Sequence, residues 1–382
     1  MNPTSSIATS FVPVVREGSV LCYRMFDVAD DVALERAAAL LHGSNYCAPS
    51  EAVIGQRPTG TMDITAVPLR VSLGTRNLTF PKLGRAFEAT CAIHVFSTGT
   101  VSVCYAFPIE PGTSLEALLP FCQELYVSET LVATAREETD TLVRLVAGAI
   151  TGGHVWDEFE DYTVVVIRSL EGDPDAEAVL QWPGLPKLML GEASPKALSE
   201  KQRKDILQYA YGYLQEDLVV VDWNSAFILD PAGGAELVDV LEFANSLLVN
   251  LRYYDDLFDA ELRRIYTELS RRRQRSALFS PYAKFAHEVM RNLLGLNEII
   301  ERIENAIKVA GDTYVARIYR MAVVRLRIDM WNESIQRKQQ LVSEAYGMLK
   351  GEAELRKSQL LEIAVIVLIV IEVIVAIRDH GR

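Results

Sequence analysis

The sequence lacks the short motifs that mark the commonest cofactor and metal sites. Neither G-x-x-x-x-G-K-[ST] nor G-x-G-x-x-G occurs in the 382 residues, so no phosphate-binding loop is indicated. The five histidines are scattered, and none belongs to an H-E-x-x-H motif. Without a nucleophile and base pair or a metal motif, we expect no catalytic residue, no metal and no cofactor.

Cysteine is scarce, and its pattern is informative. The chain has five cysteines, an odd number without C-x-x-C spacing: Cys22, Cys47, Cys91, Cys104 and Cys122. This pattern is typical of buried thiols in a reducing compartment. The first twenty residues lack a basic stretch followed by an apolar one, so we expect no secretory signal and no Arg-rich transit peptide.

Basic residues are outnumbered, 38 against 51 acidic ones, which gives a formal net charge of -13. This balance excludes a general polyanion binder, because phosphate contacts need clustered Lys and Arg. Nucleic acid is therefore not expected as a partner, except for a local RNA contact. The densest basic cluster is Arg271, Arg272, Arg273 and Arg275. It indicates either a contact with anionic lipid or structured RNA, or only a favourable interaction with a helix C-terminus.

The first half predicts an α+β fold with a mixed α/β head at residues 20–232, after a flexible N-terminus at 1–19. Short β-branched or aromatic runs alternate with helical patterns, and their β-α-β-β-α-β order predicts a ferredoxin-like sheet. The predicted strands are Val20–Phe26, Met62–Leu73, Thr90–Phe96, Val101–Phe107 and Tyr162–Ile167. Gly99 is expected in a hairpin turn, and Gly233 with Gly234 is expected to mark the domain boundary.

The second half predicts a long antiparallel helical and coiled-coil region at residues 235–359. Apolar residues recur in alternating steps of four and three, as in Leu237, Leu241, Ala244 and Leu248, and again from 286 to 310. Asp255 interrupts the apolar row of the first helix, and Arg325 belongs to the mostly polar second row of the third helix, with Asn332 and Gln339. We expect these two to form a structural ion pair, because burying either charge alone is costly. The alternative is a solvated Asp255.

The tail, residues 360–377, is an apolar helix interrupted only by Glu362 and Glu372. Its 18 residues approach the length that crosses a bilayer, so a C-terminal membrane anchor is expected, with the protein on the cytoplasmic side of a membrane and not secreted. The alternative is that the tails of several copies pack against one another in a homo-oligomer.

Several segments resemble the Required for Meiotic Nuclear Division family, also called domain of unknown function 155. They are 241–245, 251–257, 94–101, 218–223 and 361–372, within a resemblance that covers Val20 to Ile377. The signature residues that correspond are Glu242, Asn245, Arg252, Tyr253, Tyr254 and Asp255. Because no mitochondrial targeting segment is present, the chain resembles a bacterial member. The resemblance implies a membrane-associated tether with a translation-related protein partner.

These observations together predict a non-enzymatic, membrane-associated scaffold or tether that binds a macromolecular partner through its head and forms homo-oligomers. Two alternatives stay open. One is a soluble homo-oligomer whose apolar tails self-associate, and the other is an enzyme of unrecognised type.

Overall fold

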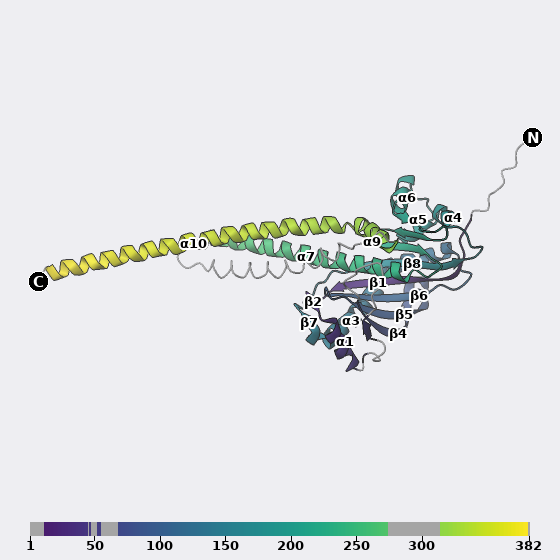
Figure 1. Cartoon of the computed structure of the whole chain (residues 1–382), viewed down its shortest axis with the longest axis horizontal. Coiled ribbons are helices and arrows are strands. Elements are labelled where there is room, and N and C mark those ends of the chain that lie inside the picture. Colours follow the sequence, from purple (N-terminus) through teal and green to yellow (C-terminus); the bar gives the residue numbers. More distant parts are fainter. Residues whose placement is uncertain (1–10, 45, 47–51, 55–67, 274–313, 381–382) are drawn as a thin grey trace, which may run out of the picture. The chain divides into compact units, whose positions relative to one another are not determined.

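The computed structural model describes residues 11–44, 46, 52–54, 68–273 and 314–380, and its centre is a large β-sheet (Figure 1). Within these residues the sheet has nine strands: β1 (Val15–Asp27), β3 (Ala52–Ile54), β4 (Leu69–Phe80), β5 (Arg85–Val95), β6 (Thr100–Pro108), β8 (Glu160–Leu170), β9 (Ala210–Tyr211), β10 (Leu218–Val221) and β11 (Ser225–Leu229). Their order in space is β3-β4-β5-β6-β1-β8-β11-β10-β9. A separate pair joins β2 (Asp31–Val32) to β7 (Ile150–Thr151).

Neighbouring strands of the large sheet are antiparallel, except that β8 and β11 are parallel. The central register places Tyr23 of β1 opposite Cys104 on one side and Tyr162 on the other. The β5–β6 hairpin turns at Gly99, as its sequence predicts, with φ of 90°. A Cβ atom there would lie 1.6 Å from the carbonyl oxygen of Ala29, so only glycine fits.

One face of the sheet carries the main apolar core. Helices of this layer are α1 (Leu34–His42), α2 (Leu119–Val127), α3 (Glu129–Leu145), α4 (Ala176–Gln181), α5 (Leu185–Leu190) and α6 (Glu200–Leu207), with short 3-10 helices η2 (Pro81–Leu83), η3 (Leu115–Leu118) and η4 (Ala147–Ala149). Phe121 of α2 makes T-shaped contacts with Phe80 and Phe107 of the sheet, with ring centroids 5.9 and 5.2 Å away. Burial of such aromatic side chains is a major part of folding stability.

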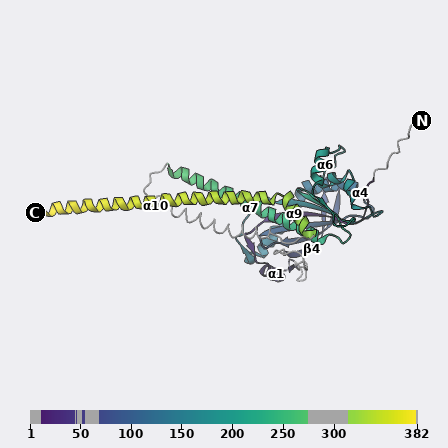
Figure 2. The ribbon, with the colours of Figure 1, turned by 45° about the horizontal axis from the view of Figure 1, so that its top comes forward.

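The opposite face is covered by α7 (Ala235–Arg273) and α9 (Tyr314–Arg325), which lie side by side over the strands (Figures 1 and 2). Phe243 of α7 stacks on Tyr319 of α9 at 6.0 Å and also lies 6.3 Å from Phe96 at the end of β5. Every residue from Val240 to Leu251 is buried. A helix buried on all sides lies inside a core, so its polar residues, Glu242, Asn245, Ser246 and Asn250, must find hydrogen-bond partners there.

The chain divides into two compact units. Unit 1 comprises residues 1–251 and 303–329, and unit 2 comprises residues 252–302 and 330–382. Unit 2 contains the rest of α7 and most of α10 (Ile328–His380). The two helices are tied together within unit 2 by Lys338 of α10, whose ammonium lies 2.8 Å from the carboxylate of Asp255 and 2.7 Å from that of Asp259.

The predicted fold class is wrong in its main features. The sheet is not a ferredoxin-like β-α-β-β-α-β unit, because its nine strands have the order β3-β4-β5-β6-β1-β8-β11-β10-β9. The region from 235 is not a separate helical coiled coil, because α7 up to Leu251 and α9 belong to the core of unit 1. Their apolar rows pack against strands rather than only against helices. The flexible N-terminus also differs, since β1 begins at Val15.

The second heptad stretch, 286–310, and residues 1–10 lie outside the described residues. Four of the five cysteines are buried and free, as predicted, and Cys47 lies outside the described residues.

The predicted membrane anchor at 360–377 is contradicted. In the part of the chain that the structure describes, no helix is long and apolar enough to cross a membrane. The same finding contradicts the expected membrane partner and the expected location on the cytoplasmic side of a membrane.

Candidate functional site

The face of the sheet under α7 carries a buried histidine–carboxylate pair and, beside it, a partly exposed ion pair. The Nδ1 atom of His94 on β5 lies 2.8 and 2.7 Å from the two carboxylate oxygens of Glu242 on α7. One helical turn away, Arg70 of β4 pairs with Asp239 at 2.6 Å. Arg70 and His94 are opposite each other in the register, and Asp239 and Glu242 are three residues apart on α7. Arg70 and His94 of the sheet therefore each face a carboxylate of α7.

A second buried cluster joins the ends of β1 and β6 to α7. The side chain of Asp27 is fully buried and accepts a hydrogen bond from the amide of Asn250. The other carboxylate oxygen of Asp27 lies 2.6 Å from Nε2 of His154. The Asn250 amide also donates to Thr100 Oγ1 at 3.0 Å, and Thr100 in turn donates to the carbonyl of Ser246 at 3.3 Å. This cluster fixes the position of α7 at the level where unit 1 ends.

Burial and pairing shift the protonation of this cluster. Burial raises the pKa of Asp27, and the hydrogen bonds from His154 and Asn250 only partly offset that effect. For His154, burial alone would lower the pKa, but the hydrogen bond and charge of Asp27 outweigh it, so the pKa is raised above its ordinary value. Both shifts favour the protonated forms. The pair thus holds its protons more tightly than the separate side chains would.

Arg325 and Asp255, predicted to pair with each other, have other partners. On α9, the Nε atom of Arg325 donates to Asp222 at 2.9 Å, and its guanidinium also lies 3.0 Å from Asp205. Asp255 pairs with Lys338 and accepts a hydrogen bond from Ser334 at 2.9 Å. Each of the two residues therefore has an opposite charge within its own unit. Arg325 pairs with Asp222 and Asp205, and Asp255 pairs with Lys338, in place of the predicted pair.

The predicted signature residues fall into two groups. Glu242 and Asn245 are buried in unit 1, where Asn245 donates to the carbonyl of Leu241 at 2.8 Å. Arg252, Tyr253, Tyr254 and Asp255 belong to unit 2. The structure therefore does not assemble them into one site within either unit.

The predicted basic cluster is described only in part. Arg271, Arg272 and Arg273 are the last residues of α7 as described, and Arg275 lies outside the described residues. The predicted anionic partner of this cluster stays a prediction.

Sequence reasoning missed the partners that make Glu242 and Asn250 important. His94 and His154 are two of the five scattered histidines, and no sequence pattern connects either of them to Asp27 or Glu242. The one available signal was a carboxylate, Glu242, between the apolar residues Leu241 and Phe243 of a helix, which indicates a buried partner without identifying it.

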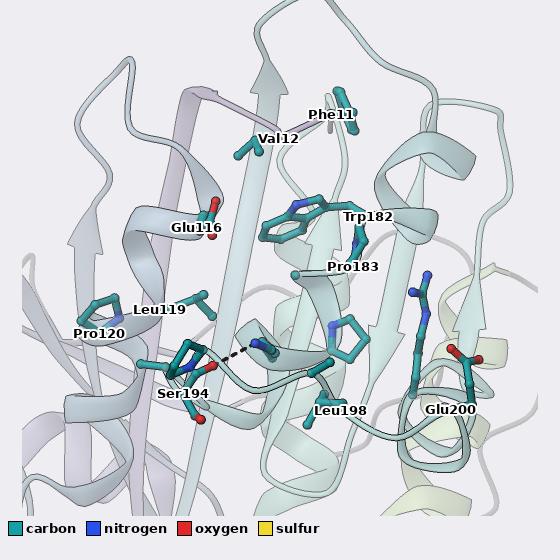
Figure 3. A pocket seen from close by; sticks show the side chains of 17 residues that line it. Phe11, Val12, Glu116, Leu119, Pro120, Trp182, Pro183, Ser194, Leu198 and Glu200 are labelled. Atoms are coloured by element: carbon teal, nitrogen blue, oxygen red, sulfur yellow. Dashed lines mark hydrogen bonds between the residues drawn. The ribbon is translucent and has the colours of Figure 1, made fainter. Parts of the chain in front are cut away.

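An open groove lies on the other side of the sheet, in the layer of α2, α5 and α6 (Figure 3). Its volume is about 680 Å³, and apolar side chains such as Leu119, Trp182 and Leu198 line much of it. Lys187 at its floor donates to the carbonyl of Ser194 at 2.8 Å. The groove is thus suited to apolar contact. The buried His94 and Glu242 pair lies across the sheet from it.

Among the described residues, no three His, Cys, Asp or Glu side chains are grouped so that they could hold a metal ion. The histidine and carboxylate pairs above are therefore pairs and not parts of a larger ligand set.

Comparison with known proteins identifies the family. The model of the family described as "Uncharacterized protein MJ0711, N-terminal domain" matches residues 17–236, more than half of the chain. A relative from Methanocaldococcus jannaschii, the uncharacterized protein MJ0711, is 25% identical over 219 residues, which cover 57% of this chain and 66% of that protein's length. No solved structure matches.

These matches contradict the resemblance to the Required for Meiotic Nuclear Division family, and the archaeal relative gives no support to a bacterial member. The matched region instead covers the sheet and the helices of its main apolar face. The chain therefore belongs to the family of the uncharacterized protein MJ0711 N-terminal domain.

Proposed function

We propose that the protein is a non-enzymatic scaffold: α10 associates with α10 of other copies and so holds several copies of unit 1 together, each available to a macromolecular partner. The single observation that carries this proposal is the exposed aliphatic segment of α10 from Leu361 to Ile371. Nine aliphatic side chains of this segment are half or more exposed: Leu361, Ile363, Val365, Ile366, Val367, Leu368, Ile369, Val370 and Ile371.

We expect the exposed apolar surface of this segment to be buried by contact with other apolar surface. A helix that is apolar on all sides is stable in water only when other apolar surface surrounds it. Each buried aliphatic side chain of this size stabilises an assembly by roughly 1.5 to 3 kcal/mol relative to its exposed state. Several such side chains together favour association strongly, even after the loss of translational and rotational freedom.

The spacing of the segment indicates which side faces the other copies. Ile363, Val367 and Val370 recur in steps of four and three, which keeps one stripe directed at a partner helix. At about 100° per residue, Glu362 and Glu372 lie on the opposite side of the helix from this stripe. Identical helices can therefore join through the stripe while both carboxylates face solvent. Since β-branched residues predominate, more than two helices are favoured.

The arrangement of unit 1 supports a binding role over a catalytic one. Its buried histidine and carboxylate pairs connect the sheet to α7, and each is satisfied by the other member of the pair. The groove in Figure 3 lies on the other face of the sheet and is lined largely by apolar residues. Proton-transfer groups and an accessible groove are therefore separated by the sheet.

The test is the molar mass of the full chain, measured by size-exclusion chromatography with light scattering over a range of concentrations. We expect an oligomer that dissociates when Ile363, Val367 and Val370 are all replaced by serine. The matched control replaces Val365, Ile366 and Ile369, which lie on the side of Glu362 and Glu372, and should remain oligomeric. A full chain that is monomeric at every concentration, or that remains in solution only with detergent, would contradict the proposal. Equal effects of the two triple variants would contradict the assigned stripe.

A further inference from the structure

We infer that the groove of Figure 3 binds an extended, proline-rich peptide segment of a partner protein. This groove is called the Trp182 groove below, and all the residues that line it belong to unit 1. The inference rests on the proposed function in one respect, that unit 1 binds a macromolecular partner. It goes further by naming the binding site and the chemical class of that partner.

The side chain of Trp182 carries a hydrogen-bond donor without an acceptor. Only 5% of the residue is exposed, and its indole ring lines the groove between Val12 and Pro183 (Figure 3). The indole nitrogen forms no hydrogen bond with any residue that the structure describes, and it is not among the polar atoms sealed from solvent. The small accessible part of this side chain therefore includes the N–H group. Because this group only donates, a ligand that satisfies it must supply an acceptor.

The position of the indole ring is fixed by its neighbours. A Cβ atom at Gly184 would lie 2.1 Å from Cζ2 of the indole, so the ring lies directly against the backbone of Gly184. The φ of Gly184 is -80°, a value open to any residue, so glycine is required there for space and not for conformation. The Trp182 carbonyl also accepts a hydrogen bond of 3.2 Å from the N–H of Leu185. The donor is thus held in place before any ligand binds.

Two further side chains of the Trp182 groove have unused donors. Lys187 on α5 donates to the carbonyl of Ser194 at 2.8 Å, which occupies one of its three N–H groups (Figure 3). Arg203 on α6 donates to the carbonyl of Gln181 at 3.0 Å and has further N–H groups available. Both side chains are half-buried and already bind backbone carbonyl oxygens. They are therefore suited to the carbonyl oxygens of a second chain.

The charges around the groove favour an uncharged occupant. Lys187 and Arg203 are its basic residues, and Glu116 and Glu200 are its acidic ones, so the formal charges of the lining cancel. A neutral segment can contact this lining without burying a charge that lacks a partner. We therefore expect hydrogen bonds and apolar contacts, and not ion pairs, to determine the affinity.

A proline-rich segment has the complementary chemistry. Proline has a backbone carbonyl but no N–H, so such a segment offers acceptors to the three donors and brings few donors that would be left unpaired. Its extended polyproline conformation is largely formed before binding, so less conformational entropy is lost. Docking on grooves lined by aromatic residues is a recurrent mode of recognition for such segments.

The shape of the groove favours a peptide chain over other occupants. A small apolar ligand normally lies in a cavity that covers most of its surface, whereas this space of about 680 Å³ is an open groove. Its lining residues belong to η3, α2, α5, α6 and the connecting loops, and none of them belongs to a described strand. Addition of a β-strand is therefore not supported, because it would need the edge of a strand. Phe11 and Val12, which precede β1, show that one wall is itself a segment of polypeptide without helix or strand structure.

The test is fluorescence anisotropy of the full-length protein with three labelled ten-residue peptides. One consists of proline, one of alternating leucine and proline, and one of alternating glycine and serine. We expect at least one of the two proline-containing peptides to bind and the glycine and serine peptide not to bind. Binding should change little with salt concentration, because no ion pair is formed.

A matched pair of variants tests the donor. Trp182→Phe keeps an aromatic ring but removes the N–H group, and it should weaken peptide binding about fivefold, the loss expected for one hydrogen bond. Trp223→Phe makes the same change at an exposed tryptophan outside the groove and should bind as the unchanged protein does. Melting temperatures of both variants show whether the fold is retained.

Gly184→Ala tests the position of the ring. The added Cβ atom displaces the indole, so binding should weaken by roughly tenfold or more. Gly172→Ala is not a suitable comparison, because the φ of Gly172 is 77° and alanine would be strained there. Gly43→Ala is the matched control, since its φ is -83° and a Cβ atom there has its nearest neighbour at 3.6 Å. This control should leave peptide binding unchanged.

The inference is overturned if neither proline-containing peptide binds, if the glycine and serine peptide binds equally well, or if Trp182→Phe binds as tightly as Trp223→Phe. Binding of a labelled twelve-carbon fatty acid, with no binding of either proline-containing peptide, would assign the groove to a small apolar ligand instead. Light scattering on the same samples keeps this test separate from the proposed self-association. Loss of peptide binding with unchanged molar mass, and loss of the oligomer with unchanged peptide binding, report on different parts of the chain.

Discussion

The two faces of the nine-stranded sheet are packed by different chemistry. On the face under α2 and α3, aromatic and aliphatic side chains such as Phe80, Phe107 and Phe121 pack together, and Arg24 is buried among them with a hydrogen bond of 2.6 Å to the carbonyl of Leu125. On the face under α7, charged and amide side chains are buried among apolar ones, in the His94–Glu242 and Asp27–Asn250 contacts. The first arrangement stabilises by burial and tolerates small shifts, whereas the second requires particular atoms to meet.

This difference explains how the position of α7 on the sheet is fixed. A helix held by apolar contacts alone could slide or rotate by a fraction of a turn at little cost. Glu242 and Asn250 are eight residues apart, close to two helical turns, and each has a fixed partner on the sheet. Two such contacts fix both the rotation and the height of the helix, as buried polar groups do in helical pairs with a specified register.

The largest expected effect is on the apolar face. Phe107→Ala should lower the free energy of unfolding by about 3 to 5 kcal/mol, because it leaves a cavity beside Phe80 and Phe121. Phe107→Leu, which keeps most of the volume, should cost less than half as much. Denaturant titration followed by circular dichroism measures both. Equal losses would show that this face also depends on exact geometry, and would remove the contrast between the faces.

The next effect concerns the ion pair under α7. Glu242→Ala should cost about 3 kcal/mol, because it leaves His94 buried without its partner. Replacing both members with apolar residues, His94→Leu with Glu242→Met, should restore stability to within about 1 kcal/mol of the unchanged protein. Denaturant titration again provides the comparison. A double variant less stable than Glu242→Ala would mean that the pair adds net stability and does more than fix the position of α7.

A smaller effect is expected at Asn250. Asn250→Ala should cost about 1 to 3 kcal/mol, since Asp27 and Thr100 both lose a donor inside the protein. Asn245 is a matched control in the same helix, because its amide bonds only to the preceding turn at Leu241. Asn245→Ala should therefore cost less. The reverse order would indicate that the Asp27 cluster is not what holds α7.

The smallest effect is a pH dependence from His154. Its pKa is raised in the folded protein by Asp27, despite burial, so the folded state binds the proton more tightly than the unfolded state. The stabilisation is fully present below the unfolded pKa of about 6.5 and is lost as the pH rises through the folded value. The raised pKa of Asp27 acts with the same sign at lower pH.

His154→Gln should remove the loss of stability above about pH 6.5 while leaving the rest of the pH profile in place. Melting temperatures measured between pH 5.5 and 8.5 test this. A constant difference between the two proteins over that range would contradict the assigned role of His154.

The sequence predicts some local features well because short-range physics decides them. The hairpin at Gly99 follows from a conformation that only glycine adopts without strain, and the buried free cysteines follow from their number and spacing. The polar clusters could not be predicted, because Asp27 and Asn250 are 223 residues apart and only the sheet brings them together. The same limit applies to Arg325, whose partner Asp222 is on another element.

What the sequence determined by itself was the presence of strands, helices and turns, since periodicity and glycine act over a few residues. Which of these elements share a core was decided only by the tertiary structure. The heptad spacing of α7 is equally suited to packing against a partner helix and to packing against a sheet. The pattern alone therefore does not distinguish between these two kinds of packing. The surface that covers its apolar stripe, strands β1, β5 and β6 in unit 1, comes from residues more than a hundred positions earlier in the chain.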